Sequence, residues 1–190
     1  MLVCGAMSDA PKPVNAAAII DFWKQAGPNM WFTKDDDFDR RFRETFLEAH
    51  EAAVRGELDC WLDAPDSALA LVLLLDQFPR NSFRGTPRMF ESDELARAKT
   101  DAAIQRGHDE AVDLQLKMFF YLPFGHSEDL ADQERAVALS SGFGPEVRKF
   151  SVGHRDIIKR FGRFPHRNAV LGRTSTAEEL AFLAEGGFAG

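Results

Sequence analysis

Cysteine is scarce in this sequence, and its scarcity removes several classes of protein from consideration. The chain contains two cysteines, Cys4 and Cys60, which are far apart and show no metal-ligand spacing. Neither a disulfide framework nor a cysteine zinc site is supported. No apolar run approaches the ~20 residues that a membrane-spanning helix needs. We therefore expect a cytoplasmic protein that has no membrane partner.

Motifs that would identify a reaction are also missing. The chain has no Gly-rich nucleotide-binding loop, no G-x-S-x-G around a serine nucleophile, and no pair of histidines four residues apart. The sequence consequently predicts no cofactor and no metal site. It leaves open whether the protein is an enzyme and what its oligomeric state is.

Tyrosine is rare too, with one residue against 17 phenylalanines, so we expect a dry, aromatic-rich interior. The 190 residues are 45% hydrophobic and 28% charged, which is ordinary for a globular protein of one domain. We assign residues 14–190 to a single helical-repeat domain. Residues 1–13 are expected to form a disordered leader.

What the chain does have is helical periodicity, with no convincing alternating strand pattern. Phe38, Phe42 and Phe46 recur at the spacing of one helix face, and Asn15 is placed to cap the first helix. The stretch ALALVLLLDQF, residues 68–78, is apolar almost all round, which indicates a central helix covered on every side. The predicted fold class is all-α, with about eight to nine helices.

Three prolines interrupt this helical periodicity. Pro79, Pro123 and Pro165 are 44 and 42 residues apart, and each follows an aromatic residue or a leucine where a helix is expected to stop. The spacing matches paired-helix repeats, so we predict a tetratricopeptide-like stack of antiparallel helix pairs. In such a stack the three proline-bearing ends lie at the same end. The segments DQFPRN, LPFGHSE and GRFPHRN should then meet in space.

The converging segments are rich in arginine, amide and histidine side chains. Arginine presents a planar fork that fits a carboxylate or a phosphate. We therefore favour a binding module for an anionic small molecule or a peptide carboxylate. The predicted ligand-binding residues are Asp76, Gln77, Arg80, Asn81, Arg84, His126, Glu128, Gln133, Arg163, His166, Arg167 and Asn168.

Other interpretations of the same residues stay open. The polar side chains could satisfy the free backbone groups of helix ends and act as structural links. A hydrolase-like or other acid–base enzyme could use His126 or His166 beside Glu128 or Asp76. Metal binding is disfavoured because the neighbouring arginines repel a cation.

A further alternative is an adaptor that binds protein or RNA. Residues 148–173 hold eight Lys and Arg against one acid, although the whole chain has a formal net charge of −7. The net acidity argues against nucleic acid as a partner of the whole surface. Phenylalanines in this basic segment have the spacing of a helix core and not that of base-stacking platforms.

Three long motifs resemble one known family. LLLDQFPRNSFRGT, MFFYLPFGHSEDLADQ and HRDIIKRFGRFPHRNAVLGRTSTAEELAFL resemble the signature segments of the bacterial domain-of-unknown-function family nine-two-four. The resemblance covers nearly the whole chain from about Val14. It implies an all-helical fold similar to tetratricopeptide-repeat proteins, and it implies no established activity.

Overall fold

The computed structural model describes residues 15–188, and every regular element in that range is helical. Its nine α-helices are α1 (Ala16–Ala26), α2 (Pro28–Trp31), α3 (Asp36–Val54), α4 (Pro65–Ser82), α5 (Asp93–Gln105), α6 (Leu114–Gly125), α7 (Leu130–Leu139), α8 (Pro145–Phe161) and α9 (Ala177–Ala184). The short 3-10 helices are η1 (Asp59–Asp63), η2 (Pro87–Phe90), η3 (His108–Ala111), η4 (Ser140–Phe143) and η5 (Pro165–Arg167). The predicted all-α class is confirmed. The predicted leader, residues 1–13, lies outside the described range.

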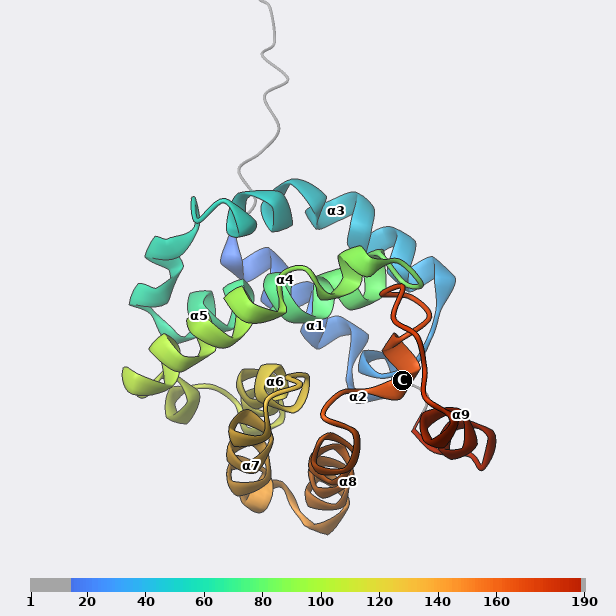
Figure 1. Ribbon diagram of the computed structural model, residues 1–190. Coiled ribbons are helices and arrows are strands. Elements are labelled where there is room, and N and C mark those ends of the chain that lie inside the picture. The colour runs from blue at the N-terminus through green and yellow to red at the C-terminus, as the bar shows by residue number, and fades with distance from the viewer. Residues whose placement is uncertain (1–14, 189–190) are drawn as a thin grey trace, which may run out of the picture.

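Helix α4 is the centre of the molecule (Figure 1). Every residue from Ala68 to Phe78 is buried, and α1, α3, α5 and α6 all pack against this helix. The helix has no polar face because it has no exposed side along these residues. The predicted central helix is therefore confirmed.

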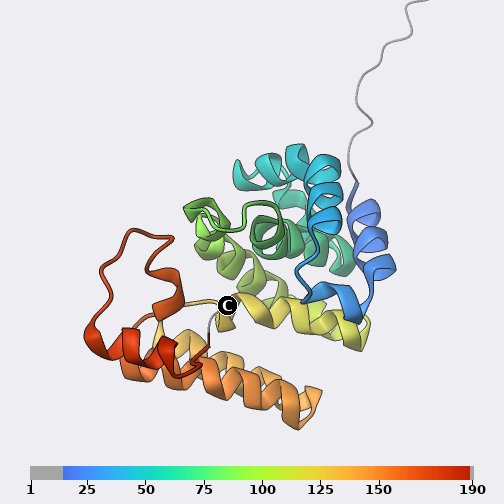
Figure 2. The same ribbon diagram turned by 90° about the vertical axis from the view of Figure 1, so that its right-hand side faces the viewer.

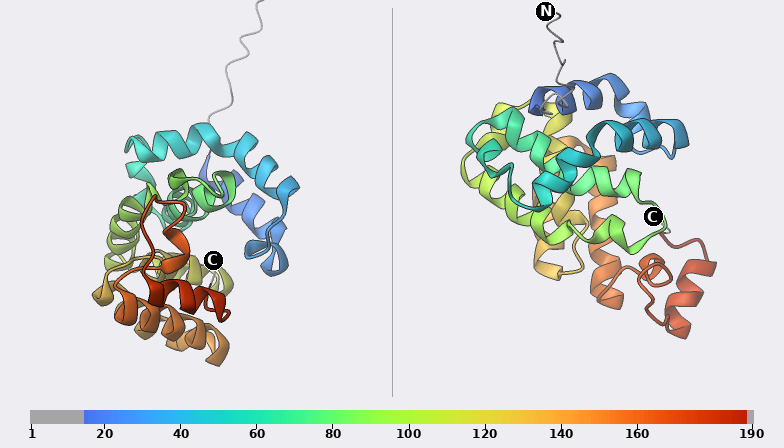
Figure 3. Two further views of the ribbon diagram at one scale, coloured as in Figure 1. Left: turned by 45° about the vertical axis from the view of Figure 1, so that its right-hand side comes forward. Right: turned by 90° about the horizontal axis from the view of Figure 1, so that it is seen from above.

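Helices α6, α7 and α8 pack on one another in chain order, with the long α8 on the outside (Figure 2). The chain after α8 then leaves this layer and runs back toward the end of α4 before it forms α9 (Figure 3). Ile157, Ile158 and Phe164 form a small apolar cluster of their own beneath this returning segment. The return brings the C-terminal basic segment to the end of the central helix.

The prediction that helices stop at the prolines is wrong for Pro79 and Pro123 and is confirmed for Pro165. Pro79 lies inside α4, which continues to Ser82, and Pro123 lies inside α6, which continues to Gly125. Helix α8 ends at Phe161, before Pro165, and is capped by Gly162, whose φ of 68° is the left-handed conformation that glycine adopts readily. The three prolines therefore occupy different structural positions.

A hydrogen bond explains why α4 tolerates Pro79. Proline has no N–H to donate to the carbonyl four residues earlier, which here belongs to Leu75. The Ser92 hydroxyl donates to that carbonyl at 2.6 Å. The last turn of the helix survives because a side chain from the start of α5 supplies the missing donor.

Candidate functional site

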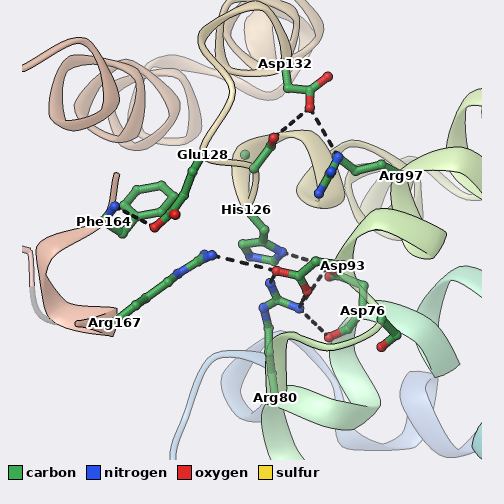
Figure 4. Close-up of polar contacts among 12 residues, drawn as sticks. Asp76, Arg80, Asp93, Arg97, His126, Glu128, Asp132, Phe164 and Arg167 are labelled. Atoms are coloured by element: carbon green, nitrogen blue, oxygen red, sulfur yellow. Dashed lines mark hydrogen bonds and ion pairs between the residues drawn. The ribbon is translucent and has the colours of Figure 1, made fainter. Parts of the chain in front are cut away.

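Three segments far apart in the sequence meet at the C-terminal end of α4 (Figure 4). His126 Nδ1 lies 2.7 Å from Asp76 Oδ1, which joins the end of α6 to α4. The backbone N–H of Phe164 donates to Glu128 at 2.8 Å, which joins the chain after α8 to the chain after α6. The predicted convergence of the proline-bearing segments is confirmed, even though α4 and α6 do not end as predicted.

Asp76 and His126 form a buried pair at the base of this site. The Asp76 side chain is 1% exposed, and Gln77 and Arg80 also contact its carboxylate, at 2.6 and 3.1 Å. Burial acts to raise the pKa of Asp76, but the charge of Arg80 and the contact with His126 outweigh it and lower the pKa. At neutral pH the residue is a carboxylate.

His126 is neutral at the same pH. Burial, together with the charge of Arg80, lowers its pKa against the opposing effect of Asp76. Because a carboxylate accepts hydrogen bonds, the neutral ring carries its proton on Nδ1. The lone pair of Nε2 is thereby left for another partner.

Asp93, at the start of α5, was missed by sequence reasoning. It accepts from Arg80 at 3.0 Å, and its Oδ2 lies 3.7 Å from Arg167. Its sequence context, Ser-Asp-Glu at residues 92–94, is typical of the start of a helix and carries no other signal. Its position in the site depends on η2, which folds the chain after α4 back over the helix end.

Arg167 is a buried arginine near Asp93 that makes few polar contacts. Its side chain is 8% exposed, and its guanidinium lies 4.7 Å from the ring centre of Phe90 and 4.5 Å from that of Phe164. No residue in the range 15–188 accepts a hydrogen bond from this guanidinium, and its Nε is buried without a partner. Burial, reinforced by the charge of Arg80, lowers the pKa of Arg167 to about 10. The side chain is still charged at neutral pH.

Glu128 and His166 complete the cluster. Arg173 reaches Glu128 with two nitrogens, at 2.7 and 3.0 Å. Burial acts to raise the pKa of Glu128, but the hydrogen bonds from Arg173 and from the Phe164 backbone lower it. The pKa of His166 falls to about 4 through burial and the charge of Arg167, and its Nδ1 is buried without a partner.

Two predicted site residues face away from this cluster. Arg84 contacts Asp39 of α3 at 2.5 Å and Asn81 at 2.6 Å. Arg84 and Asn81 line an open groove of about 960 Å³ between α3 and the end of α4. The basic and acidic side chains along this groove balance one another, so it offers no concentration of unpaired charge.

Three more predicted residues have structural partners. Gln133 is fully buried on α7 and donates to the carbonyls of Gly125 and Ser127, at 2.8 and 2.7 Å. Arg163 and Asn168 both contact Glu179 of α9, at 2.6 and 3.2 Å. For these three side chains the structural alternative is supported.

The predicted ligand-binding residues therefore fall into two groups, those that meet at the end of α4 and those that do not. The structure brings together Asp76, Gln77, Arg80, His126, Glu128, His166 and Arg167, and it adds Asp93, Arg173 and Phe90. We call these ten residues the convergent cluster. Within residues 15–188 no group of three or more His, Cys, Asp or Glu is arranged to hold a metal ion.

Comparison with known proteins agrees with the sequence motifs. Residues 19–187 match the model of a bacterial protein family of unknown function, DUF924. The chain belongs to this family. It is similar to the solved structure of a protein of unknown function from Agrobacterium tumefaciens, with 56% identity and a TM-score of 0.88 over 90% of this chain and 97% of that one. No curated protein matches the chain.

The family assignment confirms the resemblance deduced from the three motifs. The tetratricopeptide-like arrangement of helix pairs stays a prediction. Among the described residues no helix is both long enough and apolar enough to cross a membrane.

Proposed function

We propose that the protein is a binding module for a small carboxylate or related oxyanion, with Arg167 as the group that holds it. The observation that carries this proposal is the buried guanidinium of Arg167, which has no hydrogen-bond acceptor among the described residues. A buried polar group without a partner costs about 1 to 3 kcal/mol, and more when it is charged. A bound anion removes that cost.

Neighbouring arginines support this interpretation by contrast. Arg163 and Arg173, from the same segment, each direct two nitrogens at a carboxylate in the arrangement typical of structural ion pairs. The carboxylates near Arg167 are those of Asp93 and Glu128, and these are already bonded to Arg80 and to Arg173. Arg163 and Arg173 therefore each hold a carboxylate with two nitrogens, although Nε of Arg173 is also buried without a partner, and Arg167 holds no carboxylate in this way.

Two aromatic rings contact the guanidinium of Arg167 and position it for a planar ligand. Phe90 and Phe164 fix the guanidinium through cation–π contacts, which leave the edge with its N–H donors for hydrogen bonds. A carboxylate accepts from such an edge with both oxygens at once. The site is therefore suited to the terminal group of a small acid or of a peptide.

The experiment is a thermal-shift and calorimetric titration with acetate, propionate, an N-acetylated dipeptide acid, phosphate and sulfate. An anion at 100 times its dissociation constant adds about 2.7 kcal/mol of stability. For a chain of this size that corresponds to a rise in melting temperature of roughly 5 to 10 °C. Arg167→Met should abolish the rise.

The matched control is Arg148→Met, which removes an exposed arginine from the same basic segment. It should bind the anion as the wild type does. If none of these anions raises the melting temperature, or if the rise persists in Arg167→Met, the proposal is wrong.

A second candidate function is acid–base catalysis, and the 2.7 Å contact between His126 and Asp76 favours it. A histidine held by a carboxylate at Nδ1 accepts a proton at Nε2 from a substrate. The test is turnover of a ligand that binds at Arg167. His126→Asn should bind such a ligand without converting it, and equal turnover by the variant would contradict this candidate.

A further inference from the structure

The charges of the convergent cluster cancel when its histidines are neutral. Its three arginines face three carboxylates, in the set Arg80, Arg167, Arg173, Asp76, Asp93 and Glu128. An anion that enters such a neutral, largely buried site brings a charge that nothing there compensates. Because an uncompensated buried charge is costly, a second charge of opposite sign must enter with it.

Three histidines lie near the point where that charge would enter, and they differ in their partners. His126 has the carboxylate of Asp76 at 2.7 Å. His166 has no partner at Nδ1, and His154 has none at Nε2 and packs against aromatic rings. Glu128 lies near His166, but of the three rings His126 alone has a nitrogen within hydrogen-bond distance of a carboxylate among the described residues.

We propose that the site takes up a singly charged carboxylate together with one proton, and that Nε2 of His126 accepts this proton. The inference rests on the proposed function, since it requires an anion at Arg167. The proton comes from solvent and adds to the lone pair of Nε2, while Nδ1 keeps its hydrogen bond to Asp76. The cluster then gains one negative and one positive charge and stays neutral.

The surroundings of His126 explain why the free site does not hold this proton already. Helix α4 contributes Asp76 and Arg80 to the surroundings of the ring, and the start of α5 contributes Asp93. Arg167 approaches from η5, and Figure 4 shows these four residues. His154 approaches from α8. The positive charge of Arg80 and the loss of solvent keep the ring neutral. A carboxylate on Arg167 offsets the positive charges facing the ring and so favours protonation.

This coupling also selects the ligand. A monocarboxylate and one proton leave the cluster neutral, whereas a dianion leaves a surplus negative charge in a buried place. The shared chemistry is a terminal carboxylate, which a free small acid or the C-terminus of a peptide can supply. Propionate and an N-acetylated dipeptide acid separate these two sources by affinity, and both should carry the same proton linkage.

The test is the pH dependence of propionate binding, measured by calorimetry between pH 6 and pH 8. Linkage of one proton lowers the binding constant by up to about tenfold per pH unit over the range where only the complex is protonated. His126→Asn should bind more weakly and show no pH dependence. His108→Asn removes a histidine that bonds to Leu62 in η1, away from the cluster, and should keep the wild-type dependence.

The outcomes separate the two proposals. No binding of either carboxylate by the wild type at any pH contradicts the proposed function. Binding that does not change with pH, or a pH dependence that persists in His126→Asn, overturns proton coupling and leaves the proposed function in place. An NMR titration of His126 in the wild type avoids any folding defect of the variant: saturating propionate should raise its pKa by about two units or more, as uptake of nearly one proton requires, and an unchanged pKa overturns the inference.

Discussion

The Ser92 hydroxyl donates to the carbonyl of Leu75 at 2.6 Å, and it does so at the one carbonyl of α4 that Pro79 deprives of its helical donor. The contact joins the start of α5 to the end of α4. Ser92 is also adjacent to the convergent cluster, because the next residue, Asp93, belongs to that cluster. The end of α4 and the carboxylate between Arg80 and Arg167 are therefore fixed by the same turn of chain.

This relationship predicts a double-mutant result. Ser92→Ala leaves a buried carbonyl without a donor and should lower the free energy of unfolding by about 1 to 3 kcal/mol. In a Pro79→Ala background the backbone N–H returns, so the same substitution should cost markedly less. Urea denaturation of the four proteins measures both steps. Ser141→Ala, at an exposed serine, serves as the control, and equal costs in the two backgrounds would count against the assignment.

A second prediction concerns α9, where two neighbouring glutamates have different roles. Glu179 is 2% exposed, accepts from Arg163 and from the backbone N–H of Thr176, and forms a capping box with Thr176. Glu178 is 63% exposed and pairs only with Arg160. Glu179→Gln should therefore lower the free energy of unfolding by about 1 to 2 kcal/mol. Glu178→Gln should change it by less than about 0.5 kcal/mol.

Hydrogen exchange localises this effect. Amides of α9 and of η5 should exchange faster in Glu179→Gln, while those of α4 should keep their protection, because the C-terminal apolar cluster is separate from the main core. Equal loss of protection in both glutamate variants would contradict the distinction between the two residues.

A third prediction concerns pH. Burial lowers the pKa of His154 to about 3, and the charges of His126 and Arg167 act in the same direction. Between about pH 6.5 and pH 3, His154 is protonated in the unfolded chain but stays neutral in the folded chain. Protonation of His154 therefore does not reduce stability above pH ~6.5, and it reduces stability progressively as the pH decreases, by on the order of 5 kcal/mol at the acid limit.

The measurement is the free energy of urea unfolding from pH 7 to pH 4. His154→Gln should show a shallower decline over this range than the wild type, and His108→Gln should follow the wild type. A wild-type slope in His154→Gln would show that other groups govern the acid sensitivity.

The sequence could predict elements whose signal is local. Asn15 caps α1 by accepting from the Ala18 N–H, as predicted, and Thr176 with Glu179 forms a capping box, one of two S/T-x-x-E spacings in this stretch together with Ser175 and Glu178. The burial of α4 follows equally well, because a helix apolar on all sides has only the interior to occupy. These features depend on residues within one or two turns of each other.

What the sequence could not predict depends on contacts between distant segments. A proline does not end α4, because a serine thirteen positions later replaces the missing donor. The direction of Arg84, toward Asp39 and away from the cluster, is decided by the packing of α3 on α4. Asp93 likewise enters the site only through the turn at η2. None of these outcomes has a signal in local composition.

The most direct test of the central claim compares the melting temperatures of Arg167→Met and Arg173→Met in a buffer free of carboxylates, phosphate and sulfate. Methionine at 167 fills the space beside Phe90 and Phe164 and removes a guanidinium whose contacts are a 3.7 Å ion pair with Asp93 and no hydrogen bond, so the melting temperature should change by less than about 3 °C. Methionine at 173 leaves Glu128 without its partner, and the melting temperature should fall by roughly 3 to 10 °C. A fall of the same size in Arg167→Met would show that Arg167 holds the fold together, and it would contradict the assignment of this arginine to a ligand.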